Sequence, residues 1–131
     1  MQLVIVRHAE AASGEPDELR PLTAQGREAA RALGEQLAGE GIRPDAVLTS
    51  PLLRARETAR ELARPAGLDP EPDDRLAPGA TAESVKAAAG ERGEVVVVVA
   101  HQPDCGRIAA ELTGGPEPPF APAAMLAIDV T

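Results

Sequence analysis

Short apolar runs alternate with longer segments of helical periodicity along this chain. Apolar runs predict three strands: Gln2–Val6, Ala46–Thr49 and the five valines Val95–Val99. The first is apolar at successive positions, as expected for a strand that is covered on both faces. A fourth apolar stretch, Ala124–Val130, is expected to form the last strand. The strands are short, and turn-forming residues separate them from the segments with helical spacing.

Four helices are predicted between and after these runs. They are expected at about residues 23–38, 50–66, 81–89 and 103–112. The segments 10–20, 69–79 and 114–122 are rich in Gly, Pro or charge and are expected to be loops, the second with room for one short edge strand. Alternating strands and helices favour a three-layer α/β sandwich with a mostly parallel central sheet, formed as one domain from residues 1–131.

The ends and inner faces of the first two helices can be predicted in more detail. Thr23 is expected to cap the first helix, which Gly39 and Gly41 end; its buried face would carry Ala29, Ala30, Leu33 and Leu37. Ser50 is expected to cap the second helix, with Pro51 at the first helical position. The buried stripe of that helix would consist of Leu52, Ala55, Ala59, Leu62 and Ala66.

Composition restricts the classes of function. The net charge of −8 argues against a nucleic-acid-binding protein, which needs a basic face. No apolar run is long enough to span a membrane, and Leu3–Val6 is too short for the apolar region of a signal peptide. Cys105 is the only cysteine, so it forms no intramolecular disulfide and is expected in the core, which is consistent with a cytoplasmic protein.

Charged residues follow the predicted strands at their carboxyl ends, where open α/β sheets bind ligands. Arg7 and His8 follow the first strand, and His101, the only other histidine, follows the valine strand. Arg54 lies in the first turn of the second helix, where the positive end of the helix dipole makes a cation unfavourable unless an anion lies between them. Arginine suits such a site because its planar guanidinium binds two phosphate oxygens at once.

Each of these residues alone has a simpler structural explanation. A single histidine at a strand end usually makes a structural hydrogen bond, and Arg54 alone would usually be a solvated surface residue. The charged residues farther along the same helix are expected to form a solvated face: Glu57, Arg60, Glu61 and Arg64. Two histidines and two arginines at neighbouring strand ends, taken together, favour a phosphate site.

The same residues carry a family resemblance. VRHAEA at Val6–Ala11 resembles the signature of the histidine phosphatase superfamily, which includes the phosphoglycerate mutases, with Ala9 in place of the usual Gly. Three further segments match in order: RPLTAQGREAA from Arg20, SPLLRARETA from Ser50 and VVVAHQPD from Val97. The resemblance covers nearly the whole chain and implies a phosphoglycerate mutase-like fold.

The resemblance also implies roles for individual residues. His8 would be the nucleophile that becomes phosphorylated, which suits an imidazole that is neutral near pH 7. Arg7, Arg54 and a protonated His101 would complete the phosphate pocket, and Arg20 would border it. Neither a cofactor nor a metal is implied.

Within the superfamily the chain is most similar to the short bacterial SixA-like phosphohistidine phosphatases. Short loops predict an open, shallow site that suits a phosphate presented on a protein surface. No general acid is evident: Gln102 stands where the acid phosphatases have Asp, and Glu83 is better explained as part of the first turn of a helix. Glu10, Asp17 and Asp104 stay open as candidates for the acid.

The predicted function is a phosphatase that removes phosphate from phosphohistidine on a protein such as a histidine phosphotransfer domain, through a phosphorylated His8. Inorganic phosphate is the product, and neither nucleic acid nor a membrane is a partner. An imidazole leaving group needs less help from an acid than an alkoxide does. Two alternatives remain: a broad phosphatase of small phosphate esters, and a module that binds phosphate without catalysis.

Overall fold

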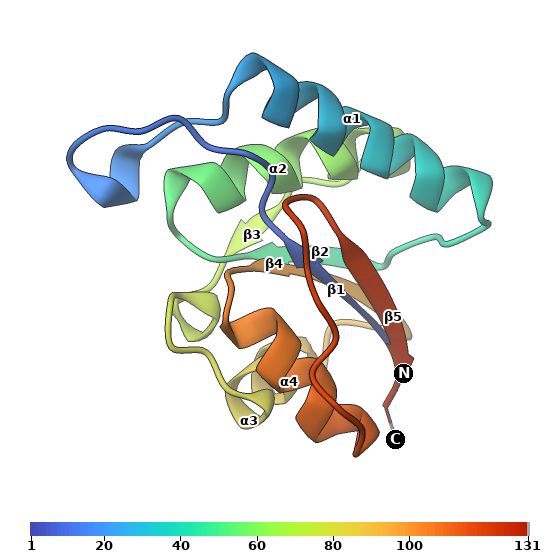
Figure 1. Cartoon of the computed structure of the whole chain (residues 1–131). Helices are drawn as coiled ribbons and strands as arrows, with labels where there is room; N and C mark the ends of the chain where they lie inside the picture. Colours follow the sequence, from blue (N-terminus) through green and yellow to red (C-terminus); the bar gives the residue numbers. More distant parts are fainter. Residues whose placement is uncertain (131) are drawn as a thin grey trace.

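A five-stranded sheet forms the centre of the computed structural model, which describes residues 1–130 (Figure 1). The strand order is β3-β2-β4-β1-β5, and β5 alone runs antiparallel to its neighbour, so the mostly parallel sheet is confirmed. The strands are β1 (Gln2–Arg7), β2 (Ala46–Thr49), β3 (Glu71–Pro72), β4 (Val95–Ala100) and β5 (Met125–Asp129).

Helices cover both faces of the sheet, with α1 and α2 on one face and α3 and α4 on the other (Figure 1). The three-layer α/β architecture is therefore as predicted. The helices are α1 (Ala24–Gly39), α2 (Leu53–Ala63), α3 (Ala82–Ala89) and α4 (Asp104–Thr113), and the short 3-10 turns are η1 (Asp17–Leu19), η2 (Arg64–Ala66) and η3 (Asp74–Leu76). None of the helices in the described residues is long and apolar enough to cross a bilayer.

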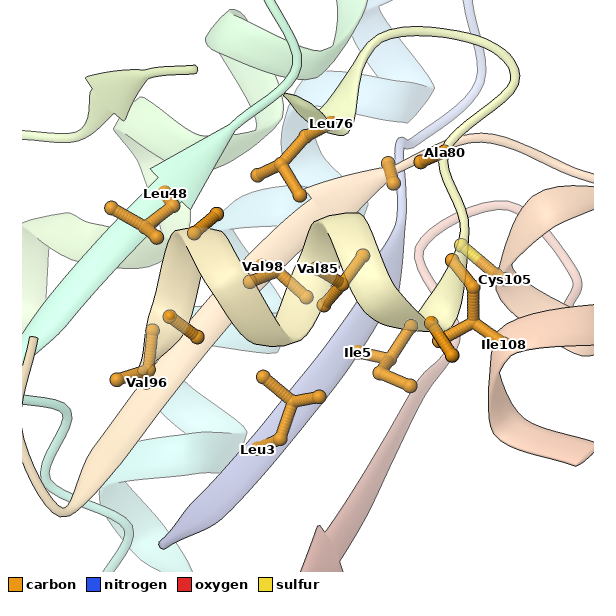
Figure 2. Packing of buried hydrophobic residues seen from close by; sticks show 14 of the residues in the cluster. Leu3, Ile5, Leu48, Leu76, Ala80, Val85, Val96, Val98, Cys105 and Ile108 are labelled. Carbon is orange, nitrogen blue, oxygen red and sulfur yellow. The ribbon is translucent and has the colours of Figure 1, made fainter. Parts of the chain in front are cut away.

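The core lies on both sides of the sheet because alternate residues of the central strands point to opposite faces. Val97 and Val99 pack with α1 and α2, whereas Val96 and Val98 pack in the cluster that contains α3 and α4. Figure 2 shows this second cluster, which includes Cys105. Burial raises the pKa of the Cys105 thiol to about 12, so this cysteine is an unreactive core residue, as expected.

The predicted cap of α2 is wrong. The helix begins at Leu53 with Leu52 as its N-cap residue, so Pro51 is not the first helical residue and Leu52 lies outside the helix. The Ser50 hydroxyl accepts only a long hydrogen bond from the Leu52 N–H, 3.3 Å, because its close partner is His101 at 2.7 Å. Ser50 is therefore part of a tertiary contact rather than a helix cap.

Two predicted inner-face positions are also wrong. Ala29 is exposed because it lies off the buried face of α1. That face consists of Gly26, Ala30, Leu33, Gly34 and Leu37, and its two glycines lie against the backbone of other segments. Ala66 is exposed because α2 ends at Ala63 and the chain continues as η2.

The other helix ends follow the predictions closely. The Thr23 hydroxyl accepts a hydrogen bond from the Gly26 N–H at 2.9 Å and caps α1. Glu83 is exposed in the first turn of α3, as expected from the sequence. The segment 10–20 is mainly loop, but it contains η1 and is tied to the chain before α1 by a bridge between Ala11 and Leu22. This loop lies next to the carboxyl end of β1.

Candidate active site

The sheet order brings the predicted residues together. The strands β2, β4 and β1 are neighbours, so Ser50, His101 and His8 follow adjacent strand ends. The His8 N–H donates to the Ala100 carbonyl at 3.0 Å, which extends the ladder beyond the strand. A cavity of about 460 Å³ lies there, and all five predicted site residues line it: Arg7, His8, Arg20, Arg54 and His101.

The His8 ring is held in the tautomer that leaves Nε2 unprotonated, as a nucleophile requires. Its Nδ1 atom lies 2.8 Å from the Ala9 carbonyl oxygen, so Nδ1–H donates and the lone pair is on Nε2. Burial lowers the pKa of His8 below its ordinary value; the bond to the Ala9 carbonyl opposes this shift, and the charges of Arg54 and Arg7 reinforce it. His8 is therefore neutral near pH 7, and Nε2 is free to attack an electrophile.

His101 is deeply buried beside His8. The two rings lie 5.2 Å apart between centroids, and His101 Nε2 lies 2.7 Å from the Ser50 hydroxyl oxygen. Burial lowers the pKa of His101 to about 4, and the charge of Arg54, together with a proton on His8 when it is present, lowers it further. In the free protein the ring is therefore neutral near pH 7, whereas the family resemblance expects a protonated His101 in the site that holds phosphate. A bound anion would raise this pKa.

Arg54 is the second residue of α2 and only 7% exposed. Its guanidinium donates to the Asp17 backbone carbonyl at 2.9 Å and lies 3.3 Å from the Asp17 carboxylate. Although some desolvation opposes the shift, Arg54 and Arg20 lower the pKa of the Asp17 carboxyl. Asp17 thus supplies the negative charge that the helix terminus and the buried cation require.

Arg7 and Arg20 complete the cationic side of the cavity. Arg7 donates from Nη1 to the Phe120 carbonyl at 2.8 Å, and Arg20 donates from Nε to the Asp17 carboxylate at 2.9 Å. Three buried nitrogens of the site have no hydrogen-bond partner among the described residues: Arg7 Nε, Arg54 Nε and His101 Nδ1. All three belong to residues that the sequence assigns to phosphate binding.

Thr58 links the loop after β1 to α2, and the sequence did not predict this role. Its hydroxyl oxygen accepts from the Ala9 N–H at 2.9 Å and donates to the Arg54 carbonyl at 2.8 Å. The side chain is fully buried, so the loop after β1 is fixed against α2. A signal was present in the sequence: Thr58 is the one hydroxyl residue within the alanine-rich stripe of α2.

The three open candidates for a general acid lie in different surroundings. Glu10 and Asp17 line the cavity, and the Glu10 carboxylate accepts a hydrogen bond from the Thr23 hydroxyl at 2.7 Å. Asp104 is not among the lining residues; it is buried, accepts from the Gly79 N–H at 2.8 Å and pairs with Arg107. Within residues 1–130, no group of three or more His, Cys, Asp or Glu side chains is placed to hold a metal ion.

Comparisons with known proteins agree with this arrangement. Residues 3–78 match the family model described as the histidine phosphatase superfamily (branch 1). Phosphohistidine phosphatase SixA of Escherichia coli (strain K12) is 34% identical over 129 residues, covering 92% of this chain and 79% of SixA. An uncharacterized protein of Picosynechococcus is 38% identical over 125 residues, covering 88% of this chain and 74% of its own length.

The fold is also that of a solved relative. The structure of the protein histidine phosphatase SixA complexed with tungstate superposes with a TM-score of 0.89 at 31% identity, covering 98% of this chain and 88% of the other. At this coverage the superposition spans nearly the whole chain, so the similarity is one of the complete fold.

Proposed function

The chain belongs to the histidine phosphatase superfamily, and on that premise we propose that it removes phosphate from phosphohistidine on a protein, with His8 as the nucleophile. The observation that carries the proposal is the state of His8: neutral, with Nδ1–H bound to the Ala9 carbonyl and the lone pair on Nε2. The similar SixA structure holds tungstate, an oxyanion, which supports an oxyanion site in this fold.

The reaction proceeds in two displacements at phosphorus. His8 Nε2 attacks and a new N–P bond forms, while the N–P bond of the substrate phosphohistidine breaks. Its electron pair stays on the departing nitrogen, and the ring leaves as neutral imidazole because its other nitrogen carries a proton. Water then attacks phospho-His8, gives up a proton to solvent, releases inorganic phosphate and returns the electron pair of the N–P bond to Nε2. Arg7, Arg54 and Arg20 neutralise the charge of the phosphoryl oxygens, and His101 lies beside them at the wall of the cavity.

The state of Asp17 favours phosphohistidine over phosphate esters as the substrate. An alkoxide leaving group requires a proton in the transition state, whereas an imidazole leaves with a conjugate acid of pKa about 6.5. Asp17 is ionised at neutral pH because Arg54 and Arg20 lower the pKa of its carboxyl against an opposing desolvation. It is therefore a poor proton donor, although it lines the cavity.

The test compares release of phosphate from a phosphorylated histidine phosphotransfer domain and from p-nitrophenyl phosphate, for the wild type and His8→Ala. We expect a strong preference for the phosphoprotein, an acid-labile phosphoenzyme in the wild type, and neither turnover nor labelling in a folded His8→Ala. Equal or better turnover of the ester would favour the small-ester phosphatase. Binding of the phosphoprotein without any release would favour a non-catalytic module.

A further inference from the structure

A second cavity lies beside the active site and belongs to none of the chemistry described above. It is a groove of about 600 Å³ between the outer side of α2 with η2 and the segment that leads into β3. We call it the arginine groove, because Arg56, Arg60 and Arg64 line one side of it; Leu68, Asp69 and Pro70 contribute to the other.

The charge of the arginine groove is opposite to that of the molecule. The whole chain carries a net charge of −8, yet three arginines and only one carboxylate, Asp69, line this groove. Arg56 and Arg60 are exposed, and no carboxylate within residues 1–130 forms a salt bridge with either. Their positive charge is therefore available to a partner.

The acidic residues of α2 form no salt bridge with Arg56 or Arg60 because they have other partners, which include the third arginine of the groove, Arg64. Glu57 accepts a hydrogen bond from the Leu22 N–H at 2.8 Å and lies 3.6 Å from Arg27. Glu61 is buried and lies 3.1 Å from Arg64. Of the expected solvated face, Arg60 and Arg64 are exposed, whereas Glu57 is half-buried and Glu61 is buried.

The spacing of the arginines selects the kind of partner. The four-residue step places Arg56 and Arg60 on one side of α2, about 6 Å apart along its axis at 1.5 Å per residue, and Arg64 follows them where α2 passes into η2. A single phosphate group is too small to contact both ends of this row. A partner helix with Asp or Glu at the same four-residue spacing matches it along the whole length.

The arginine groove begins next to the active site. Thr49, which lines the groove, directly precedes Ser50, the hydrogen-bond partner of His101 at the wall of the active site. We propose that the arginine groove is a docking surface for an acidic helix of the phosphorylated protein that the active site dephosphorylates. This inference rests on the proposed function and adds the surface that recognises the substrate protein.

Charge reversal tests the docking surface. The variant Arg56→Glu/Arg60→Glu is compared with Arg43→Glu/Lys86→Glu, which makes the same change in net charge at exposed positions outside the groove. The substrates are free phosphohistidine and a phosphorylated phosphotransfer domain with an acidic row on the helix that carries its histidine. We expect kcat/KM for the phosphoprotein to fall by about tenfold or more at low salt in the groove variant only, mainly through KM.

Three further results complete the test. Free phosphohistidine should be hydrolysed at the wild-type rate by both variants, the difference for the phosphoprotein should shrink as salt is added, and arginines placed in the acidic row of the substrate should restore the groove variant. If the wild type is active but the groove variant matches it, the docking surface is wrong and the proposed function stands. If the wild type hydrolyses neither substrate, both are wrong.

Discussion

The hydroxyl oxygen of Ser50 lies 2.7 Å from Nε2 of His101, and the two residues are 0% and 4% exposed. This bond joins the ends of β2 and β4 and fixes the orientation of the His101 ring at the wall of the cavity. Because burial keeps His101 neutral near pH 7 in the free protein, the bond to Ser50 orients the ring before a phosphoryl group binds.

Removing the Ser50 hydroxyl is expected to impair the site. Ser50→Ala leaves a buried imidazole nitrogen without its partner, which should lower the free energy of unfolding by about 1–3 kcal/mol. The His101 ring is then free to turn, so kcat should fall while His8 can still be phosphorylated. Urea denaturation and steady-state kinetics measure the two effects. Ser13→Ala, at an exposed position, is the control; wild-type kcat in Ser50→Ala would show that the bond does not position His101.

Asp17 and a phosphate ion should compete for the same guanidinium. The Asp17 carboxylate lies 3.3 Å from Arg54 and 2.9 Å from Arg20, so Asp17→Asn removes the negative charge but retains the carbonyl that Arg54 Nη1 binds. We expect inorganic phosphate to inhibit this variant roughly threefold to tenfold more strongly than the wild type. Inhibition by phosphate in a kinetic assay gives the answer.

The same variant separates two roles for Asp17. If Asp17 only balances the charge of the arginines, kcat for a phosphate ester changes little in Asp17→Asn. A large loss of kcat for the ester, with phosphohistidine turnover retained, would instead identify Asp17 as the general acid.

The low pKa of His101 makes stability depend on pH. Its pKa is about 4 in the folded protein, because of burial, and near 6.5 when unfolded. The unfolded chain therefore binds the proton first, so this stability is complete above pH 6.5 and is lost as the pH falls towards 4. The expected slope is about 1.4 kcal/mol per pH unit, or about 2 kcal/mol between pH 6.5 and 5. The lowered pKa of His8 adds a contribution of the same sign.

His101→Gln provides the comparison for this prediction. The free energy of unfolding, measured in urea at several pH values from 7 to 5, should fall less steeply in the variant than in the wild type. The window stops at pH 5 because carboxylates begin to titrate below it. Parallel pH profiles for the two proteins would mean that His101 is not held neutral by burial.

Much of the site could be predicted from the sequence because parallel strands end at one edge of a sheet. His8 and His101 each follow an apolar run, and that position alone was enough to group them. The order of the strands could not be predicted, because the apolar pattern of the valine run does not determine that β4 lies between β1 and β2. The family resemblance supplied the roles of Arg7, Arg54 and Arg20, which still require experiment.

The errors have a common physical origin in contacts between distant residues. Ser50 has the sequence context of a helix cap, but its close hydrogen-bond partner is 51 positions away. Thr58 has the position of a small core residue, but its hydroxyl joins Ala9 to Arg54. The sequence predicts a buried Ala29 because glycine is not counted as an apolar residue in a helical pattern. In the structure Gly26 and Gly34 occupy the buried face of α1 instead.

Gly26 offers a test of how the first helix supports the site. A Cβ atom at this position would lie inside contact distance of the Glu10 backbone carbonyl, two residues from His8. Backbone cannot move aside as a flexible side chain can, so Gly26→Ala should displace the loop after β1. We expect a loss of about 2–3 kcal/mol in the free energy of unfolding and a marked fall in kcat.

Gly39→Ala is the matched control, because it lies in the same helix and its Cβ would have no neighbour within 4 Å. Alanine reduces the freedom of the unfolded chain and favours the helix, so this variant should be neutral or stabilised by up to about 1 kcal/mol, with unchanged kcat. Urea denaturation and phosphate release measured on both variants separate a general effect of alanine from contact with Glu10. Equal behaviour of the two variants would show that α1 does not constrain the loop that carries His8.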